Sequence, residues 1–204
     1  MRTVSLMALL LLILSLPARA ADYWPDDATR TYVFGSLPDD DRLVIDPMGG
    51  GVTAFRYVGG GCAISWSGVL SADGTLDVDD GSFFCNGIVQ PVLEVTFPEN
   101  SLLFDPLAIG GAIRVFQVTT DDGPFVVARQ IGPVESLEFG EETLDDVVLF
   151  RLGIEDPLLQ VPLIQLYVSA SAGPIRLNGK DRTDVLDGIV RETTGSWGAL
   201  KARY

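Results

Sequence analysis

The carboxylates between Asp73 and Gly81 are the group in this sequence best suited to hold an ion. Asp73, Asp77, Asp79 and Asp80 fall within eight residues, and Ca²⁺ takes oxygen ligands from such loops. The spacing departs from the D-x-D-x-D-G pattern of an EF-hand loop, and no glutamate stands at its far end. A calcium site at these four residues is therefore one interpretation. A hydrated hairpin turn without a metal is the other.

The chain contains no histidine. Ser-His-Asp and Cys-His arrangements and histidine-ligated zinc are thereby excluded. The sequence also lacks G-x-S-x-G, a phosphate-binding loop with its lysine, and a dinucleotide fingerprint after a strand. We therefore expect a protein that is not an enzyme and that carries no cofactor.

Paired carboxylates are the remaining catalytic option, because a glycosidase needs two acids across a cleft. Nearly all acidic pairs fall in predicted turns, where aspartate is common. Glu94 is the exception, although the alternation of its strand directs it outward. An enzyme acting on glycans is thus our third hypothesis. The pairs and runs are Asp26-Asp27, Asp39-Asp40-Asp41, Asp79-Asp80, Glu141-Glu142 and Asp145-Asp146.

The chain has two cysteines, Cys62 and Cys85. An even count in an exported chain favours one disulfide. The cysteines flank a stretch that turns at Asp73-Gly74, a strong hairpin signal. Redox chemistry is the alternative, but the sequence has no Cys-x-x-Cys. We predict a disulfide between Cys62 and Cys85 that closes this hairpin.

Residues 1–20 have the features of a cleaved export signal. Arg2 supplies the positive start, Leu6 to Leu16 the apolar stretch, and Ala18-Arg19-Ala20 the small-x-small cleavage site. The apolar run is short for a membrane span, although a retained anchor is the alternative. We predict a periplasmic or secreted bacterial protein with no membrane span after cleavage. Residues 21–204 are expected to form a single β-rich domain.

The charge of the chain is strongly acidic. The formal net charge is −14, and removal of Arg2 and Arg19 with the signal gives −14 − 2 = −16 for the side chains. Such a surface repels phosphate backbones and anionic membranes. We therefore expect no nucleic-acid partner. Solubility alone accounts for the acidity, and a basic partner protein is a second explanation.

Apolar and polar residues alternate with period two between Gly, Pro and Asp breakers, which is typical of β-strands. We predict an all-β fold, with one strongly curved antiparallel sheet that forms a half-barrel, barrel or sandwich. At most one short helix is expected, at Asn100–Leu107, ended by Pro106, or at Glu141–Asp146. The predicted strands are 31–34, 42–45, 52–58, 63–66, 92–97, 113–118, 125–129, 147–152, 163–168 and 175–177, with 189–191 as a last addition.

The sequence has more large apolar residues than one face of a solvated strand needs. They either fill a closed core or line a groove for an apolar ligand. Trp197, near the C-terminal end, is expected either to be buried or to mark a contact surface. The aromatic residues expected on inner faces, where they could meet a ligand, are Phe55, Tyr57, Trp66, Phe97, Phe116, Phe150 and Tyr167.

The start of the mature chain, Asp22-Tyr23-Trp24-Pro25 followed by Thr31-Tyr32, is similar to the opening of a group of bacterial exported β-proteins. The segments Val134–Leu152 and Gln165–Leu177 resemble the paired closing segments of that group. These proteins in turn resemble the periplasmic lipoprotein-carrier half-barrels, in which a curved antiparallel sheet surrounds an apolar cavity. The resemblance implies a carrier-like fold, and it transfers no binding residue to this chain.

Our leading functional hypothesis is a non-enzymatic envelope protein that binds an apolar small molecule, a lipid or a partner protein on a curved sheet. The export signal, the apolar surplus and the lack of a catalytic constellation favour it. The second hypothesis is a structural or assembly factor whose acidic loops bind a basic partner. Ligand, partner and oligomeric state are not predicted.

Overall fold

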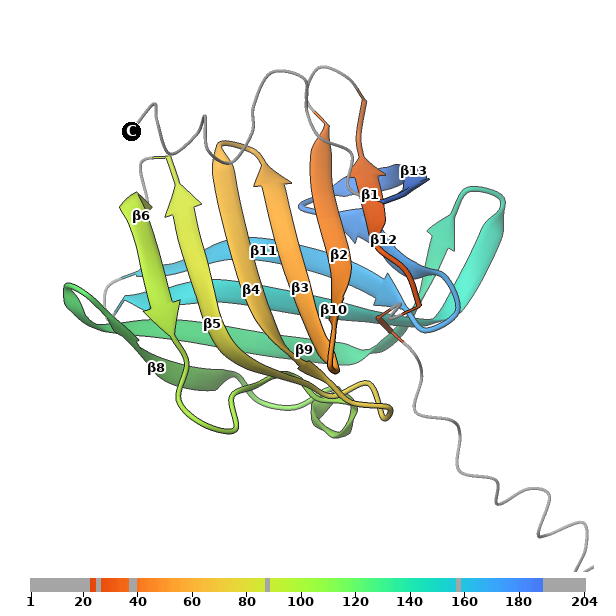
Figure 1. Ribbon diagram of the computed structural model, residues 1–204. Helices are drawn as coiled ribbons and strands as arrows, with labels where there is room; N and C mark the ends of the chain where they lie inside the picture. Colours follow the sequence, from red (N-terminus) through yellow and green to blue (C-terminus); the bar gives the residue numbers. More distant parts are fainter. Residues whose placement is uncertain (1–22, 25–26, 37–39, 87–88, 157–158, 189–204) are drawn as a thin grey trace, which may run out of the picture.

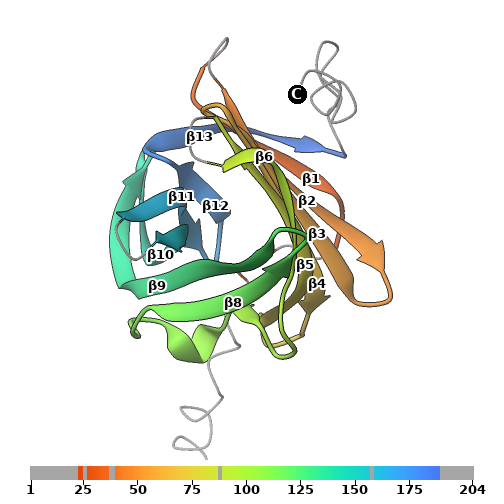
Figure 2. The same cartoon turned by 90° about the vertical axis from the view of Figure 1, so that its left-hand side faces the viewer.

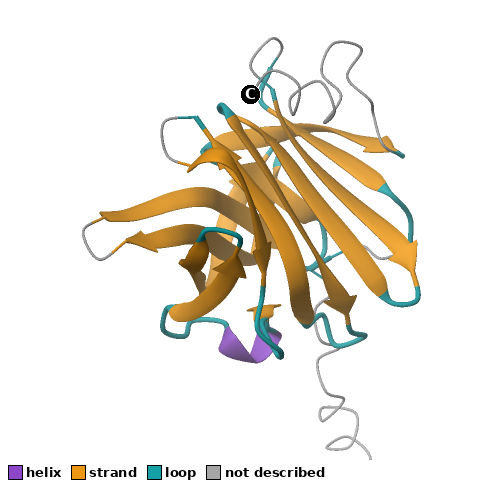
Figure 3. Cartoon of the chain, turned by 60° about the vertical axis from the view of Figure 1, so that its left-hand side comes forward, coloured by secondary structure: helices purple, strands orange, loops and turns teal. Residues whose placement is uncertain are grey.

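A computed structural model describes residues 23–24, 27–36, 40–86, 89–156 and 159–188. Thirteen strands in this part of the chain form one antiparallel sheet, and the only helix described is one turn of 3-10 helix (Figure 3). The predicted all-β fold with at most one short helix is confirmed. The predicted signal at residues 1–20 and the segment 189–204, with its predicted strand and Trp197, lie outside the described residues.

The first six strands form a meander in which each strand pairs with the next. From Asp41 to Asp46 buried and half-buried side chains alternate, as the period-two pattern predicts, whereas residues 81–85 are all buried. The strands are β1 (Arg30–Phe34), β2 (Asp41–Gly49), β3 (Val52–Gly59), β4 (Cys62–Leu70), β5 (Leu76–Cys85) and β6 (Val89–Thr96).

A short connection, β7 (Leu102–Phe104) and the 3-10 turn η1 (Pro106–Ala108), leads to a second meander. Within it, β9 and β10 form a long hairpin whose tip extends beyond the other strands (Figure 1). The strands of this meander are β8 (Arg114–Thr120), β9 (Gly123–Phe139), β10 (Glu142–Asp156), β11 (Leu159–Ser169), β12 (Gly173–Leu177) and β13 (Lys180–Asp187).

The two meanders join at both sides, so the sheet closes into a barrel (Figure 2). On one side β1 pairs with β13 along its whole length, from Arg30 opposite Asp187 to Phe34 opposite Arg182. On the other side, Thr96 opposite Thr119 is the one register pair between β6 and β8 in the described part of the chain. Of the predicted architectures, the barrel is therefore the one observed.

Aromatic side chains from both meanders pack around Trp24, which lies ahead of β1 and is 1% exposed. Its indole meets the rings of Phe55, Phe104 and Phe150 edge-on, with ring centroids 5.2, 5.2 and 6.2 Å apart. Tyr23 packs on Phe104 beside it. The N-terminal end of the described chain is thus anchored in the core, where burial of aromatic surface is the main stabilising contribution.

The predicted hairpin and disulfide are both present. β4 and β5 are joined by a turn in which Gly74 has φ 82°, a conformation that glycine adopts without strain. The Asp73 carboxylate accepts a hydrogen bond from the backbone N–H of Thr75. Cys62 and Cys85 are opposite one another in the β4–β5 register and are disulfide-bonded. Closing a loop of this length adds about 3 kcal/mol by the chain-entropy relation.

Three local predictions need correction. The Asn100–Leu107 segment forms strand β7 followed by η1, and Pro106 begins this helical turn rather than ending one, because proline suits the first helical position. The Glu141–Asp146 segment forms no helix, since Glu142 begins β10. The pattern also gave no sign of β13, whose side chains are all half-buried or exposed.

Candidate functional site

Six of the seven predicted inner-face aromatic residues are buried, and most touch another ring. Phe55 and Trp66 are opposite one another on β3 and β4 and stack with centroids 5.5 Å apart. Phe97 and Phe116 meet edge-on at 6.1 Å. These contacts describe a packed core. The buried six are Phe55, Tyr57, Trp66, Phe97, Phe116 and Phe150.

Tyr167, the seventh aromatic residue, is half-buried between the buried neighbours Leu166 and Val168 on β11. Since successive residues of a strand point to opposite faces, its side chain lies on the outside of the barrel. The Arg176 guanidinium lies 5.8 Å from its ring centroid, a cation–π contact.

Tyr57 belongs to a buried polar cluster. Its hydroxyl donates to the Asp41 carboxylate (3.2 Å) and accepts from the side-chain amide of Asn178 (3.0 Å). Burial, then the Asp41 charge, raises the pKa of Tyr57. The Lys180 ammonium lies 2.9 Å from the other Asp41 oxygen. The cluster ties β2 and β3 to the β12–β13 hairpin, which is a structural role.

The four aspartates of the calcium hypothesis are spread over the turn and the start of β5. The Asp73 carboxylate is engaged by Thr75, which lowers the pKa of Asp73. Burial, then the Asp79 charge, raises the pKa of Asp77, and one Asp77 oxygen is buried without a hydrogen-bond partner. In the described residues no three His, Cys, Asp or Glu side chains gather as a metal site. Asp80 instead belongs to a different feature.

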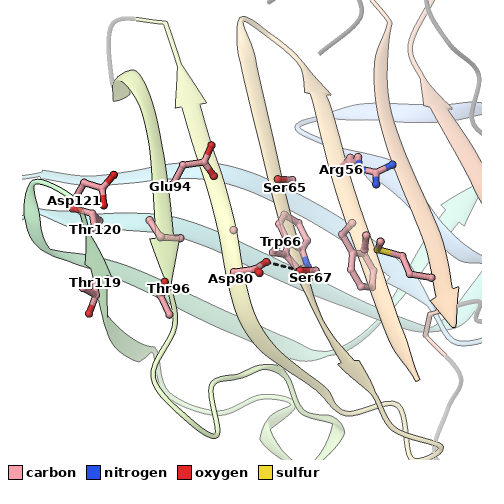
Figure 4. A pocket seen from close by; sticks show the side chains of 15 residues that line it. Arg56, Ser65, Trp66, Ser67, Asp80, Glu94, Thr96, Thr119, Thr120 and Asp121 are labelled. Atoms are coloured by element: carbon pink, nitrogen blue, oxygen red, sulfur yellow. Dashed lines mark hydrogen bonds between the residues drawn. The ribbon is translucent and has the colours of Figure 1, made fainter. Parts of the chain in front are cut away.

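A polar groove of about 460 Å³ lies on the outer face of the barrel, across β3, β4, β5, β6 and the end of β8 (Figure 4). Two neighbouring rows of outward residues build it. One row is Arg56, Ser65, Ser82 and Glu94, and the other is Ala54, Ser67, Asp80, Thr96 and Thr119. Every residue of the two rows except Ser82 lines the cavity. The remaining lining residues are Met48, Thr120 and Asp121, together with four residues whose side-chain positions alternate toward the barrel interior: Phe55, Trp66, Gly81 and Val95.

The register of the strands fixes the spacing of two acids in this outer groove. Asp80 is opposite Thr96, and Glu94 is opposite Ser82. Asp80 and Glu94 are therefore diagonal neighbours on one face, with side chains about 7–8 Å apart. Both are exposed. One ammonium or guanidinium group seated between them would meet both carboxylates.

The other charges of the outer groove leave it acidic. Asp121, from the β8–β9 turn, adds a third carboxylate at one end. Arg56, the single cation among the described residues of the lining, lies 3.5 Å from Asp46 and is therefore already paired. Hydroxyl groups fill the space between the charges. Ser67 donates to Asp80, and Ser65 shares a hydrogen bond with Ser82.

A second acidic surface is the projecting tip of the β9–β10 hairpin, residues 134–146. It carries six acids and no lysine or arginine. Its acids are partly used within the protein, because Asp145 accepts from Ser136 and Asp146 accepts from Ser169. The outer groove combines its acids with a cavity, so it is the better candidate site.

Sequence reasoning found Glu94 and its outward direction, and the structure confirms that it is exposed. It missed the groove. Ser65 and Ser67 alternate with Trp66, and this was a readable sign of an outward polar face. The approach of Glu94 and Asp121 to these serines depends on strand register and barrel closure, which the local sequence pattern does not contain.

Comparison with known proteins gives no match: no protein-family model fits the chain, and no curated protein or solved structure is significantly similar to it. The similarity to lipoprotein carriers therefore stays a prediction. No helix in the described residues is long and apolar enough to cross a membrane. The disulfide is typical of a protein outside the cytoplasm.

Proposed function

We propose that this chain is an exported, non-enzymatic envelope protein that binds a basic segment of a partner protein in the outer groove. The observation that carries the proposal is the diagonal placement of Asp80 and Glu94 on one exposed face. Carboxylates at this spacing, with hydroxyl groups between them, suit lysine or arginine side chains. The acidity of the whole chain would speed the approach of a basic partner.

A partner protein is favoured here over an apolar ligand. The lining of the groove consists mainly of hydroxyl and carboxylate side chains, which suit polar recognition. Most of the aromatic residues proposed for an apolar ligand pack against other rings in the core. An apolar cargo, as in lipoprotein carriers, is the alternative. Native mass spectrometry of the protein purified from its periplasm or medium would detect it.

Export through a cleaved signal at residues 1–20 is part of the proposal. The disulfide supports it, because disulfides persist mainly in oxidising compartments. The N-terminal sequence of the exported protein tests it directly. A chain that begins at Ala21 is expected, and one that begins at Met1 would contradict cleavage.

The binding experiment uses a fluorescent hexalysine peptide and the full mature chain, with anisotropy measured at several salt concentrations. The double variant Asp80→Asn/Glu94→Gln should weaken binding about tenfold, or about 1.4 kcal/mol. The control Glu138→Gln/Glu142→Gln makes the same charge change at exposed positions of the hairpin tip, and it should leave affinity within twofold. Equal losses in both variants would mean unspecific attraction and would reject the outer groove as the site.

A further inference from the structure

The side chain of Phe84 presents an unusual combination of direction and burial. Phe84 follows Phe83, which belongs to the core, and it is opposite Ala63 in the β4–β5 register. Successive residues of a strand point to opposite faces, so Phe84 points outward. It is nevertheless only 4% exposed. Ala63 is too small to cover a phenylalanine ring, so side chains beyond β4 contribute to the burial of Phe84.

Phe84 continues the outward series of β5 that forms the outer groove. Phe84, Ser82 and Asp80 are two residues apart, which places the ring and the Asp80 carboxylate about 13 Å apart along the strand. Glu94 lies beside Ser82 on β6. The face therefore offers an apolar contact at one end and two carboxylates at the other. Phe84 and Glu94 are both engaged in non-covalent interactions.

Residues 189–204 carry a complementary pattern. This segment contains Arg191, Lys201 and Arg203 against a single acid, Glu192, in a chain with a net charge of −14. Trp197 precedes Lys201 by four residues. In an extended segment these two side chains are about 13 Å apart, which matches the spacing of Phe84 and Asp80.

The segment also starts within reach. The N–H of Gly188, just after β13, donates to the backbone carbonyl of Thr29. Asp187 lies in one register row with Arg30, Ile45, Phe55, Trp66 and Gly81. Five strand spacings of about 4.8 Å across the sheet and four residues of offset along the strands separate Gly188 from Phe84, about 27 Å in all. Nine residues from Gly188 to Trp197 span about 30 Å when extended.

We propose that residues 189–204 dock across β5 in the outer groove, with Trp197 on Phe84 and with Lys201 and Arg203 at Asp80 and Glu94. The segment is then an internal occupant of the acidic site. A basic partner must displace it, a consequence that rests on the proposed function. The docking itself does not depend on any partner.

Acrylamide quenching of tryptophan fluorescence in the full mature chain tests the docking. Trp24 and Trp66 are 1% and 2% exposed, so Trp197 determines the response. The wild-type protein should be quenched weakly, and Lys201→Glu/Arg203→Glu should raise the quenching constant at least about twofold. Adding Trp197→Phe should abolish that rise, which assigns it to Trp197.

A charge exchange gives the sharper result. Asp80→Lys/Glu94→Lys combined with Lys201→Glu/Arg203→Glu should restore weak quenching, while Glu138→Lys/Glu142→Lys in the same tail variant should not. Strong quenching of Trp197 in the wild type, or no rescue by the exchange, overturns the docking. Far-UV circular dichroism of each variant checks that the barrel is intact.

Hexalysine binding separates this inference from the proposed function. Lys201→Glu/Arg203→Glu should raise the affinity for the peptide about threefold or more, because the internal occupant is weakened. If groove variants lose peptide binding while Trp197 is freely quenched in the wild type, the docking is wrong and the function holds. If the docking result holds but no variant alters peptide binding, the proposed function is wrong.

Discussion

The indole of Trp24 stands edge-on to the ring of Phe150, with an interplanar angle of 89° and centroids 6.2 Å apart. Trp24 precedes the first meander, whereas Phe150 lies on β10 in the second. The same indole touches Phe55 on β3 and Phe104 on β7. One residue from the N-terminal segment therefore connects both halves of the barrel.

We predict that Trp24→Ala lowers the free energy of unfolding by about 3–5 kcal/mol, because it leaves a large cavity among these rings. Trp24→Phe should cost less, since part of the volume is kept. Leu107→Ala, at a residue that is 96% exposed, should change stability by less than about 0.5 kcal/mol. Urea unfolding followed by circular dichroism measures all three, and equal effects of the two alanine variants would contradict the anchoring role.

Lys180→Met removes the ammonium that faces the Asp41 carboxylate, whose side chain is 3% exposed. Leaving this buried carboxylate without its charged partner should lower the free energy of unfolding by about 1–3 kcal/mol. Asp181→Asn breaks the Arg176–Asp181 pair, in which the Asp181 side chain is 58% exposed. This control should cost less than about 1 kcal/mol. Thermal unfolding at constant pH compares the two, and a Lys180 effect no larger than the control would count against the buried cluster.

Asp146 gives a pH-dependent prediction. Burial alone would raise the pKa of Asp146, but hydrogen bonds from Ser169 and Ser171 lower it overall. An acid with a depressed folded-state pKa stabilises the protein above the unfolded value of about 3.9, and this contribution disappears as the pH falls through the folded-state pKa.

The stability difference between wild type and Asp146→Asn should therefore be constant at neutral pH and shrink below about pH 4. Chemical unfolding measured from pH 7 to pH 2.5 provides the comparison, with Asp122→Asn on the β8–β9 turn as the variant of equal charge. A difference that grows on acidification would refute the assignment.

Gly68 is predicted to tolerate no side chain. A Cβ atom there would collide with the Asp77 carbonyl oxygen and lie 2.6 Å from the Val78 Cα, both backbone atoms. Gly68→Ala should force β4 and β5 apart and cost more than about 2 kcal/mol. At Gly132 the nearest atoms to a new Cβ would be those of Leu149, at 3.4 Å, so Gly132→Ala is the matched control with a small effect. The urea unfolding midpoints of the two variants test this prediction. Equal shifts in the two midpoints would contradict the close contact at Gly68.

The sequence pattern predicted the strands with one buried face well. Phe55 and Tyr57 on β3, or Leu166 and Val168 on β11, alternate with less buried residues, and this pattern follows from the chain alone. β13 escaped prediction because it buries no side chain and is held by pairing with β1 and β12. Its formation depends on partners that are more than a hundred residues away on β1 and adjacent in sequence on β12.

The candidate site was harder to predict from the sequence than the fold. The calcium interpretation groups Asp80 with Asp73 and Asp77, because the three are close in sequence. In the barrel its neighbours across the strands are Ser67 and Thr96. A site assembled across five strands is set by register and closure, and local spacing groups its central acid with its sequence neighbours instead.

The asymmetric closure of the barrel determines how it would come apart. The join between β1 and β13 is a full ladder, whereas β6 and β8 share the single described pair Thr96 and Thr119. Fewer backbone bonds must break at the second join, so local opening is easiest there. The β1–β13 join is expected to stay paired when the β6–β8 join opens. Thr96 and Thr119 also line one end of the acidic groove, so such an opening would change the groove.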